Sequence, residues 1–249
     1  MSGAFRIFRF AGIQVYLHFT WFLVAWYEIE SSKYRYASPI WAVIEYVGLF
    51  GIVLLHEFGH AFACRSTGGR ADRIVLWPLG GLAFVDPPPR PGAVLWSIVA
   101  GPLVNVVLYP FLYFALKWSV QGWISASPDI QRLLFDLWRI NLGLLIFNLL
   151  PIFPLDGGQI VRALLWFKLG PVRSLKISGV LGVAGAICLG AAAYYYFRSV
   201  WIAVIAFFLL SQAAAAIQRA KAMAAQADLS ANIPPPVPEQ QQQQQPPAP

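Results

Sequence analysis

The sequence predicts an all-α polytopic membrane protein with about six transmembrane helices and one small region of β-strands. Two properties of the 249-residue chain carry this prediction: 58% of its residues are hydrophobic and only 12% are charged. Soluble globular domains carry about 25% charged residues. A chain with half that share has too few polar residues to cover a surface in water, so a soluble protein with a large core is the weaker interpretation.

Apolar runs long enough to cross a bilayer recur along the chain, since a transmembrane helix needs about 20 mostly apolar residues. The six expected spans are 11–27, 40–64, 93–116, 133–151, 177–197 and 199–217. Arg6 and Arg9 precede the first run as in a signal peptide. No small-residue cleavage pattern follows Tyr27, so we expect an uncleaved first span.

The basic residues predict the orientation of these spans. With the N-terminus in the cytoplasm, the inner segments hold twelve of the 18 lysines and arginines and the outer segments hold six. The positive-inside rule therefore favours a multi-pass protein of the cell membrane with both termini in the cytoplasm. No run of five basic residues occurs, so nucleic acid is not an expected partner despite the net charge of +7.

Residues 70–86, RADRIVLWPLGGLAFVD, alternate loosely and are too short to span a membrane. We expect a pair of short strands around a turn at Gly80 and Gly81, with an interfacial loop as the alternative. Unpaired backbone groups are costly in lipid. Such strands must therefore pack on protein or pair with an added strand.

The composition changes toward the end of the chain. The last residues read PPPVPEQQQQQQPPAP, a low-complexity stretch with too little apolar content to form a core. We expect one membrane domain over residues 1–222 and a disordered Pro- and Gln-rich tail over 223–249.

Polar side chains interrupt the second span, in the stretch LLHEFGHAFA. A charge at mid-bilayer costs at least about 2.5–3.5 kcal/mol, so His56, Glu57 and His60 need a reason to be there. Helix positions i and i+4 share a face, so both imidazoles can bind one metal ion while Glu57 reaches a water beside it. This HExxH pattern predicts Zn²⁺ with a general base, and hydrolysis of an amide bond. The alternative is that the histidines bond to neighbouring helices and Glu57 is paired.

A zinc site needs a third protein ligand. Asp156, in NLLPIFPLDGGQI, is the other acid that is strongly embedded in apolar sequence. Pro151 and Pro154 are expected to end the preceding helix, and Gly157 and Gly158 to allow tight backbone turns. Broken backbone is tolerated at membrane depth where it lines a protein cavity. An ordinary Asp-Gly turn is the alternative.

The predicted topology gives an independent argument for this ligand set. The second and fourth spans both run from outside to inside under the charge count. His56 and His60 lie late in the second span, and Asp156 lies just past the fourth. All three side chains are therefore expected at a similar depth, toward the cytoplasmic face.

HEFGH in one span and N-x-x-P-x-x-P-x-x-D-G in a later one resemble the motifs of the site-2 protease family of intramembrane zinc metalloproteases, over roughly residues 10–165. The resemblance implies that His56, His60 and Asp156 bind zinc and that Glu57 is the catalytic base. It implies that Asn148 acts near the metal on the substrate carbonyl, although a bond to a neighbouring helix explains Asn148 equally well. It also implies cleavage of transmembrane segments of other proteins near the cytoplasmic face, in regulated intramembrane proteolysis.

The resemblance extends to other segments. It identifies residues 70–86 with the family's membrane-associated strand region, which pairs with an unwound substrate. GPLVN resembles a further family segment, in which Asn105 supports the site or Gly101 and Pro102 start and pack a helix. His18 is expected to be packed or interfacial, without a metal role. Many relatives carry a PDZ or CBS domain. None is recognised in this sequence, so we expect such regulation to be absent or supplied by a membrane partner protein.

Two other functions compete with the leading prediction of an intramembrane zinc endopeptidase. A catalytically inactive scaffold or chaperone of the same fold would not need Glu57. A transporter or channel would place polar residues at several depths in several spans, whereas here they are expected at one depth. The expected partners are the lipid bilayer and a transmembrane protein substrate.

Overall fold

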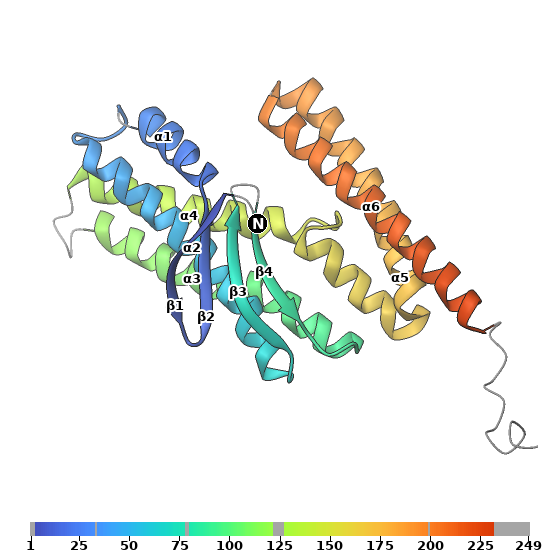
Figure 1. The fold of residues 1–249 in the computed structure, drawn as a ribbon. Helices are drawn as coiled ribbons and strands as arrows, with labels where there is room; N and C mark the ends of the chain where they lie inside the picture. The colour runs from blue at the N-terminus through green and yellow to red at the C-terminus, as the bar shows by residue number, and fades with distance from the viewer. Residues whose placement is uncertain (1–2, 33, 78–79, 122–126, 199, 232–249) are drawn as a thin grey trace, which may run out of the picture.

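The computed structural model describes residues 3–32, 34–77, 80–121, 127–198 and 200–231 (Figure 1). These residues form six α-helices and four β-strands, and a five-residue π-helical segment, Ala193–Phe197, precedes the last helix. The helices are α1 (Thr20–Ser32), α2 (Pro39–Ser66), α3 (Pro91–Val120), α4 (Pro128–Leu149), α5 (Asp156–Ala192) and α6 (Val200–Ala231). The predicted fold class, mostly helical with a small sheet, is confirmed.

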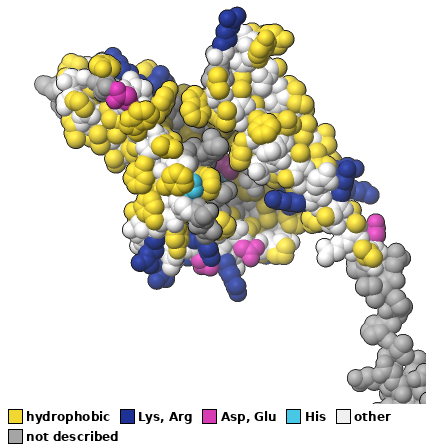
Figure 2. Space-filling model, turned by 45° about the horizontal axis from the view of Figure 1, so that its top comes forward, with side chains coloured by type: hydrophobic (Ala, Val, Ile, Leu, Met, Phe, Trp, Pro, Cys, Tyr) yellow, Lys and Arg dark blue, Asp and Glu magenta, His cyan; other side chains and the backbone are white. Residues whose placement is uncertain are grey.

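Four of the described helices are long and apolar enough to cross a membrane. They are α2, α3, α5 together with the π-helical segment, and α6. Figure 2 shows hydrophobic side chains over most of one face, with lysine and arginine gathered toward its edges. A surface of this kind suits a hydrocarbon solvent, and the chain is a membrane protein.

The first expected span, 11–27, is wrong in its first half, where the chain forms a β-hairpin. Strand β1 (Ala4–Phe10) pairs with β2 (Ile13–His18), and Phe10 faces Ile13 across the turn. Ala11 and Gly12 both have positive φ, 47° and 80°, as a two-residue hairpin turn of type I′ requires. Apolar content suggested a membrane helix here, but polar residues interrupt the run with the spacing of a strand. Only the 13 residues of α1 are helical, too few to cross a bilayer.

The four strands form one sheet in the order β1-β2-β3-β4. Strands β3 (Arg70–Trp77) and β4 (Gly80–Asp86) are antiparallel, so the pair of strands predicted within 70–86 is present. Strand β2 joins β3 in parallel, which adds the N-terminal hairpin to that pair. In the described chain β4 is an edge strand, and in Figure 1 it lies on the side of the sheet that faces α5 and α6.

The sheet packs against the C-terminal half of α2. Ile74 and Leu76 of β3 are fully buried there, in one cluster with Phe58 and Ala61 of α2. On other sides α2 contacts α3 and α4, and α3 also contacts α5. The half of α2 that carries the HExxH motif is thus enclosed by the sheet and by neighbouring helices.

The last two helices form a hairpin beside this group (Figure 1). Helix α5 bends sharply at Gly170, whose φ of 75° lies outside the helical region. Helix α6 continues to Ala231, past the boundary expected at residue 222, because AKAMAAQADLSA is rich in good helix formers. Residues 223–231 of the expected tail are therefore helical, and residues 232–249 lie outside the described residues.

We expect Ile74→Ala to lower the free energy of unfolding in detergent by about 2–5 kcal/mol, because the truncated side chain leaves a cavity between the sheet and α2. Thermal unfolding followed by circular dichroism measures the change. Ile7→Ala is the matched control, since Ile7 lies exposed on β1. Equal destabilisation by the two substitutions would contradict the packing of the sheet on α2.

Candidate metal centre and active site

The two histidines of HEFGH lie one helical turn apart on the same face of α2, as the i, i+4 spacing predicts. Their Nε2 atoms are 3.1 Å apart, and both side chains are buried. Because α2 continues past them to Ser66, their positions are set by regular helix rather than by a loop.

Asp156 approaches the same two nitrogens from a different element. Helix α4 ends at Leu149 and α5 begins at Asp156, so the break expected from Pro151 and Pro154 is present. The Oδ2 atom of Asp156 lies 3.1 Å from Nε2 of His56, and Oδ1 lies 3.5 Å from Nε2 of His60. The structure therefore brings together the three side chains that the sequence proposed as ligands.

A chain of hydrogen bonds fixes which nitrogen of each histidine carries the proton. The Asn141 amide nitrogen donates to the Asn105 main-chain oxygen (3.0 Å), so the Asn141 side-chain oxygen faces Asn105 and accepts from its amide (2.8 Å). The Asn105 side-chain oxygen then lies 2.7 Å from His56 Nδ1 and accepts a hydrogen bond from it. His60 Nδ1 donates to the main-chain oxygen of Ser97 at 2.9 Å. With the proton on Nδ1, a neutral imidazole presents a lone pair at Nε2, and both Nε2 atoms face Asp156.

These donors fit a divalent cation. Two nitrogen lone pairs and a carboxylate converge in a buried space, and Asp156 Oδ2 has no hydrogen-bond partner despite its closeness to His56. Such an arrangement is repulsive unless positive charge neutralises it. Two neutral imidazoles and one carboxylate form a ligand set that zinc accepts in catalytic sites.

Glu57 is a second carboxylate at the same place. One ligand atom from each of His56, Glu57 and His60 lies within 4.8 Å of the others, so distance alone would also admit Glu57 as a ligand. Asp156 is the better candidate because its two oxygens contact the two Nε2 atoms that carry the free lone pairs. This leaves the buried Glu57 beside the site for proton transfer.

Asn148 also faces this space. It lies two helical turns after Asn141 on α4, and its amide nitrogen is 3.5 Å from Nε2 of His56. This distance exceeds a good hydrogen bond. The Asn148 amide therefore lies near the centre but forms no good hydrogen bond with His56.

Glycines permit the close approach of three elements. A Cβ atom on Gly101 would overlap the His60 ring, so α3 can lie against that imidazole only with glycine at this position. A Cβ on Gly157 would overlap the main-chain oxygens of Leu149 and Leu150. The expectation that Gly157 and Gly158 form tight turns is wrong: both lie in the first turn of α5, and close backbone packing explains them.

Sequence reasoning missed two residues that position the site. Ser97 holds His60, and Asn141 orients Asn105, which is completely buried. Asn141 carried a signal, because it is a polar residue in an apolar span seven positions before Asn148. His18 lies apart from the centre: it is buried, bonds to Thr20 and stacks on Trp77 with ring centroids 3.9 Å apart.

A second buried polar cluster corrects the expectation that polar residues gather at one depth. Glu45 on α2 and Asp136 on α4 are 1% and 4% exposed, and Arg35 contacts them at 3.3 and 3.5 Å. Tyr36 donates to Glu45 at 3.0 Å, and burial, reinforced by this bond, raises the pKa of the phenol. Glu45 precedes His56 by about 16 Å along the helix axis. Asp156 is therefore not the only acid embedded in apolar sequence outside the motif.

The comparison with protein families decides the identity. The model of peptidase family M50 matches residues 44–124 and 119–191, which include every residue of the candidate centre. The chain belongs to peptidase family M50.

Individual proteins are similar to parts of the chain. A zinc metalloprotease of Methanocaldococcus jannaschii is 35% identical over 189 residues, which cover 76% of this chain and 53% of the relative. Stage IV sporulation protein FB of Bacillus subtilis is 38% identical over 117 residues, covering 44% and 36% of the two chains. The chain thus spans about half the length of the first relative and a smaller share of the second.

A solved structure of the same family has a similar fold. The site-2 protease from Methanocaldococcus jannaschii has a TM-score of 0.59 and 28% sequence identity, over 86% of this chain and 95% of that chain. The family resemblance read from the two motifs is therefore confirmed. The roles of the individual M50 residues stay predictions.

We expect Gly101→Ala to weaken zinc binding about 10–100-fold, because the added methyl group displaces the His60 ring and its bond to Ser97. Competition with a chromophoric chelator measures the affinity. Gly143→Ala is the control, since a Cβ at Gly143 meets open space. Unchanged affinity in Gly101→Ala would contradict the proposed place of His60 in the metal site.

Proposed function

We propose that the chain is an intramembrane zinc endopeptidase that cleaves transmembrane segments of other membrane proteins. One observation carries the proposal. In a member of peptidase family M50, both histidines of the HExxH motif on α2 contact Asp156 of α5, which is far away in the sequence. A protein whose spanning helices enclose such a centre can act on peptide bonds that other proteases cannot reach from water.

In this proposal His56, His60 and Asp156 hold Zn²⁺. The ion, when bound, supplies the Lewis acidity that polarises the scissile carbonyl and makes water a stronger acid. The protein contributes ligand geometry, since Asn105 and Ser97 hold the imidazoles with Nε2 facing inward. Without these bonds the imidazoles would be free to turn away from the site.

Glu57 takes the proton-transfer role. Its carboxylate accepts a proton from the attacking water and then returns that proton to the departing amine, so the peptide bond breaks without releasing charge into the apolar surroundings. Asn148 donates its amide hydrogen to the oxygen on which negative charge develops. Its position near His56, outside good hydrogen-bonding distance, leaves this donor available.

The edge of β4 is the proposed place where substrate is presented. The amides of a transmembrane helix are engaged in internal hydrogen bonds, so the substrate must unwind before attack. An unwound segment can regain hydrogen bonds by pairing with an edge strand, a known mode of peptide recognition. Strand β4 is such an edge in the described sheet and contacts α2, which carries the catalytic motif.

The proposed topology has several passes with both termini in the cytoplasm of a cell-membrane protein. The distribution of lysine and arginine supports it through the positive-inside rule, provided that β2 and α1 cross the membrane together, because α1 alone is too short. The catalytic centre then lies toward the cytoplasmic side, where cleavage releases a cytoplasmic fragment. A membrane partner protein would supply regulation.

We expect Glu57→Gln to keep its zinc and to lower kcat about 10²–10⁴-fold, because the amide cannot accept the proton. His56→Ala should lose both zinc and activity. Metal analysis of the purified proteins, with cleavage of a reconstituted single-span substrate, measures the two properties. If Glu57→Gln instead supports the cellular function fully, the protein acts as an inactive scaffold or chaperone of this fold.

A second expectation separates the two asparagines of α4. Asn148→Ala should keep zinc but lower kcat about 10²–10³-fold, as removal of an oxyanion donor does. Asn141→Ala should weaken zinc binding instead, because it releases Asn105 and through it His56. Zinc loss in Asn148→Ala in proportion to lost activity would show that Asn148 only supports His56.

A further inference from the structure

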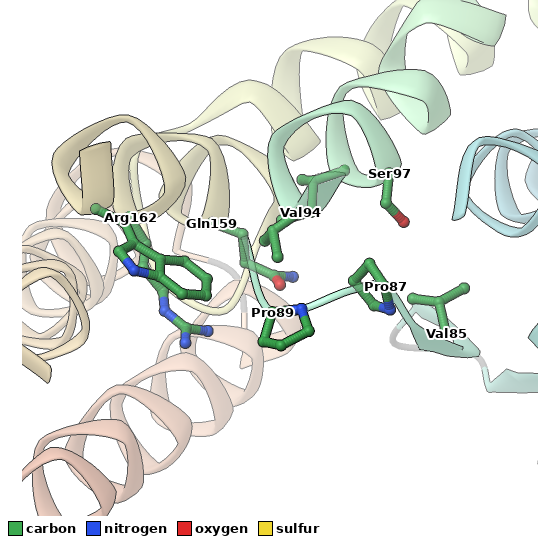
Figure 3. Close-up of a pocket in the computed structure, with 9 residues that line it drawn as sticks. Val85, Pro87, Pro89, Val94, Ser97, Gln159 and Arg162 are labelled. Atoms are coloured by element: carbon green, nitrogen blue, oxygen red, sulfur yellow. The ribbon is translucent and has the colours of Figure 1, made fainter. Parts of the chain in front are cut away.

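A pocket of about 310 Å³ lies beside the candidate metal centre and is not used by the chemistry described above. Three segments line it: Val85 and Pro87 at the end of β4, Ser97 of α3, and Gln159, Arg162 and Trp166 of α5. We call it the Arg162 pocket. In Figure 3 Gln159 and Arg162 extend from α5 toward the segment that contains Pro87 and Pro89.

The Arg162 pocket shares a wall with the metal centre. Ser97 lines the pocket. Its main-chain oxygen accepts a hydrogen bond from His60 Nδ1, and its hydroxyl donates one to the His60 main-chain oxygen at 3.3 Å. Gln159 follows Asp156 by one helical turn and donates to the main-chain oxygen of Pro154 at 2.9 Å. A group in the pocket is therefore a close neighbour of the bond that is cut.

Arg162 gives the pocket its charge. Its Nε atom is buried without a hydrogen-bond partner, and no ion pair joins its guanidinium to a carboxylate of the described residues. The Cζ atom lies 5.9 Å from the centre of the Trp166 ring, a contact that orients the guanidinium without neutralising it. The guanidinium of Arg162 therefore has N–H groups available to donate hydrogen bonds. A carboxylate suits it, because its two oxygens can accept two parallel N–H bonds from the planar guanidinium.

The remaining walls suit an aliphatic stem. Val85, Pro87 and Val94 are apolar, so an occupant with methylene groups and a terminal carboxylate satisfies the whole pocket. A volume near the lower end of ligand pockets accommodates one or two side chains rather than a large molecule. Glutamate and aspartate side chains have this composition.

Two features favour a substrate side chain over a lipid headgroup as the source of that carboxylate. Val85 belongs to β4 itself, so a segment paired with the β4 edge passes the pocket. The pocket also touches the catalytic wall through Ser97, a connection that a lipid phosphate does not need. Cytoplasmic flanks of transmembrane segments are usually rich in lysine and arginine. An acidic residue there is therefore a distinctive signal.

We propose that the Arg162 pocket is a substrate subsite that accepts an acidic side chain a few residues from the scissile bond and thereby sets which bond is cut. The proposal rests on the proposed protease function. It adds a specificity determinant: Arg162 would act by binding, while the reacting atoms remain with Glu57, Asn148 and the metal ligands.

The test uses the full chain in vesicles of neutral phosphatidylcholine with a panel of single-span peptides. The peptides differ only by Glu, Gln or Lys placed in turn at each position around the cleavage site, which mass spectrometry identifies. We expect one position at which Glu raises kcat/KM at least about tenfold over Gln and Lys lowers it, comparable to one charge-assisted hydrogen bond. Arg162→Gln should remove the difference between Glu and Gln, and Arg162→Glu should make Lys the favoured residue there.

The control variant is Arg173→Glu, an exposed arginine of α5 outside the pocket, which should keep the wild-type preference. Zinc content and elution volume show whether each variant is folded. If Arg162→Glu does not fold, Arg162→Gln and the peptide series on the wild type still decide the question.

The outcomes separate the two proposals. If the zinc-loaded wild type cleaves no peptide, the protease function fails. Cleavage without a preferred acidic position, or a preference that survives in Arg162→Gln, overturns the subsite alone. If anionic phosphatidylglycerol in the vesicles changes the cleavage of all peptides equally, and only when Arg162 is present, the pocket binds a lipid headgroup and the subsite proposal is wrong.

Discussion

Two imidazole nitrogens and a carboxylate meet at contact distance in the buried interior, and neighbouring side chains hold them there. The repulsion between their lone pairs would separate them if each side chain could turn. Asn105 and Ser97 prevent this by accepting hydrogen bonds from the two Nδ1–H groups, and Asn141 donates in turn to the main-chain oxygen of Asn105. These three side chains are therefore preorganised to bind a cation.

The helices around these three side chains approach one another closely. Glycine at position 101 lets α3 touch the His60 ring, and glycine at 157 lets α5 begin against the end of α4. Each contact brings one element within reach of the centre: α3 supplies Ser97 and Asn105, and α5 supplies Asp156. The Arg162 pocket lies beside this centre, because Ser97 both lines the pocket and bonds to His60. Catalysis and substrate selection would then share one wall.

Local patterns predicted the centre better than they predicted the fold around it. His56, Glu57 and His60 lie within one helical turn, so their spacing alone put both imidazoles on one face. Asp156 was proposed because it is an acid embedded in apolar sequence, directly after Pro151 and Pro154. The Asn141–Asn105–His56 chain was not found, since its bonds join residues 36 and 49 positions apart through packing that no local pattern encodes. The β1–β2 hairpin was missed for a different reason: its apolar content matched a membrane helix, although Ala11-Gly12 and the alternation on either side favour a hairpin.

The parallel pairing of β2 with β3 has a consequence for biogenesis. All of α1 and α2 lie between these neighbours in the chain, so the sheet cannot close during synthesis until both helices have been laid down and β3 has emerged. Until then the N-terminal hairpin lacks its neighbour β3, although it can already pack on α2, where Phe10 contacts Phe58. Closing of the sheet then encloses the half of α2 that carries the HExxH motif, so this half reaches its final packing only after α1 and α2 are in place.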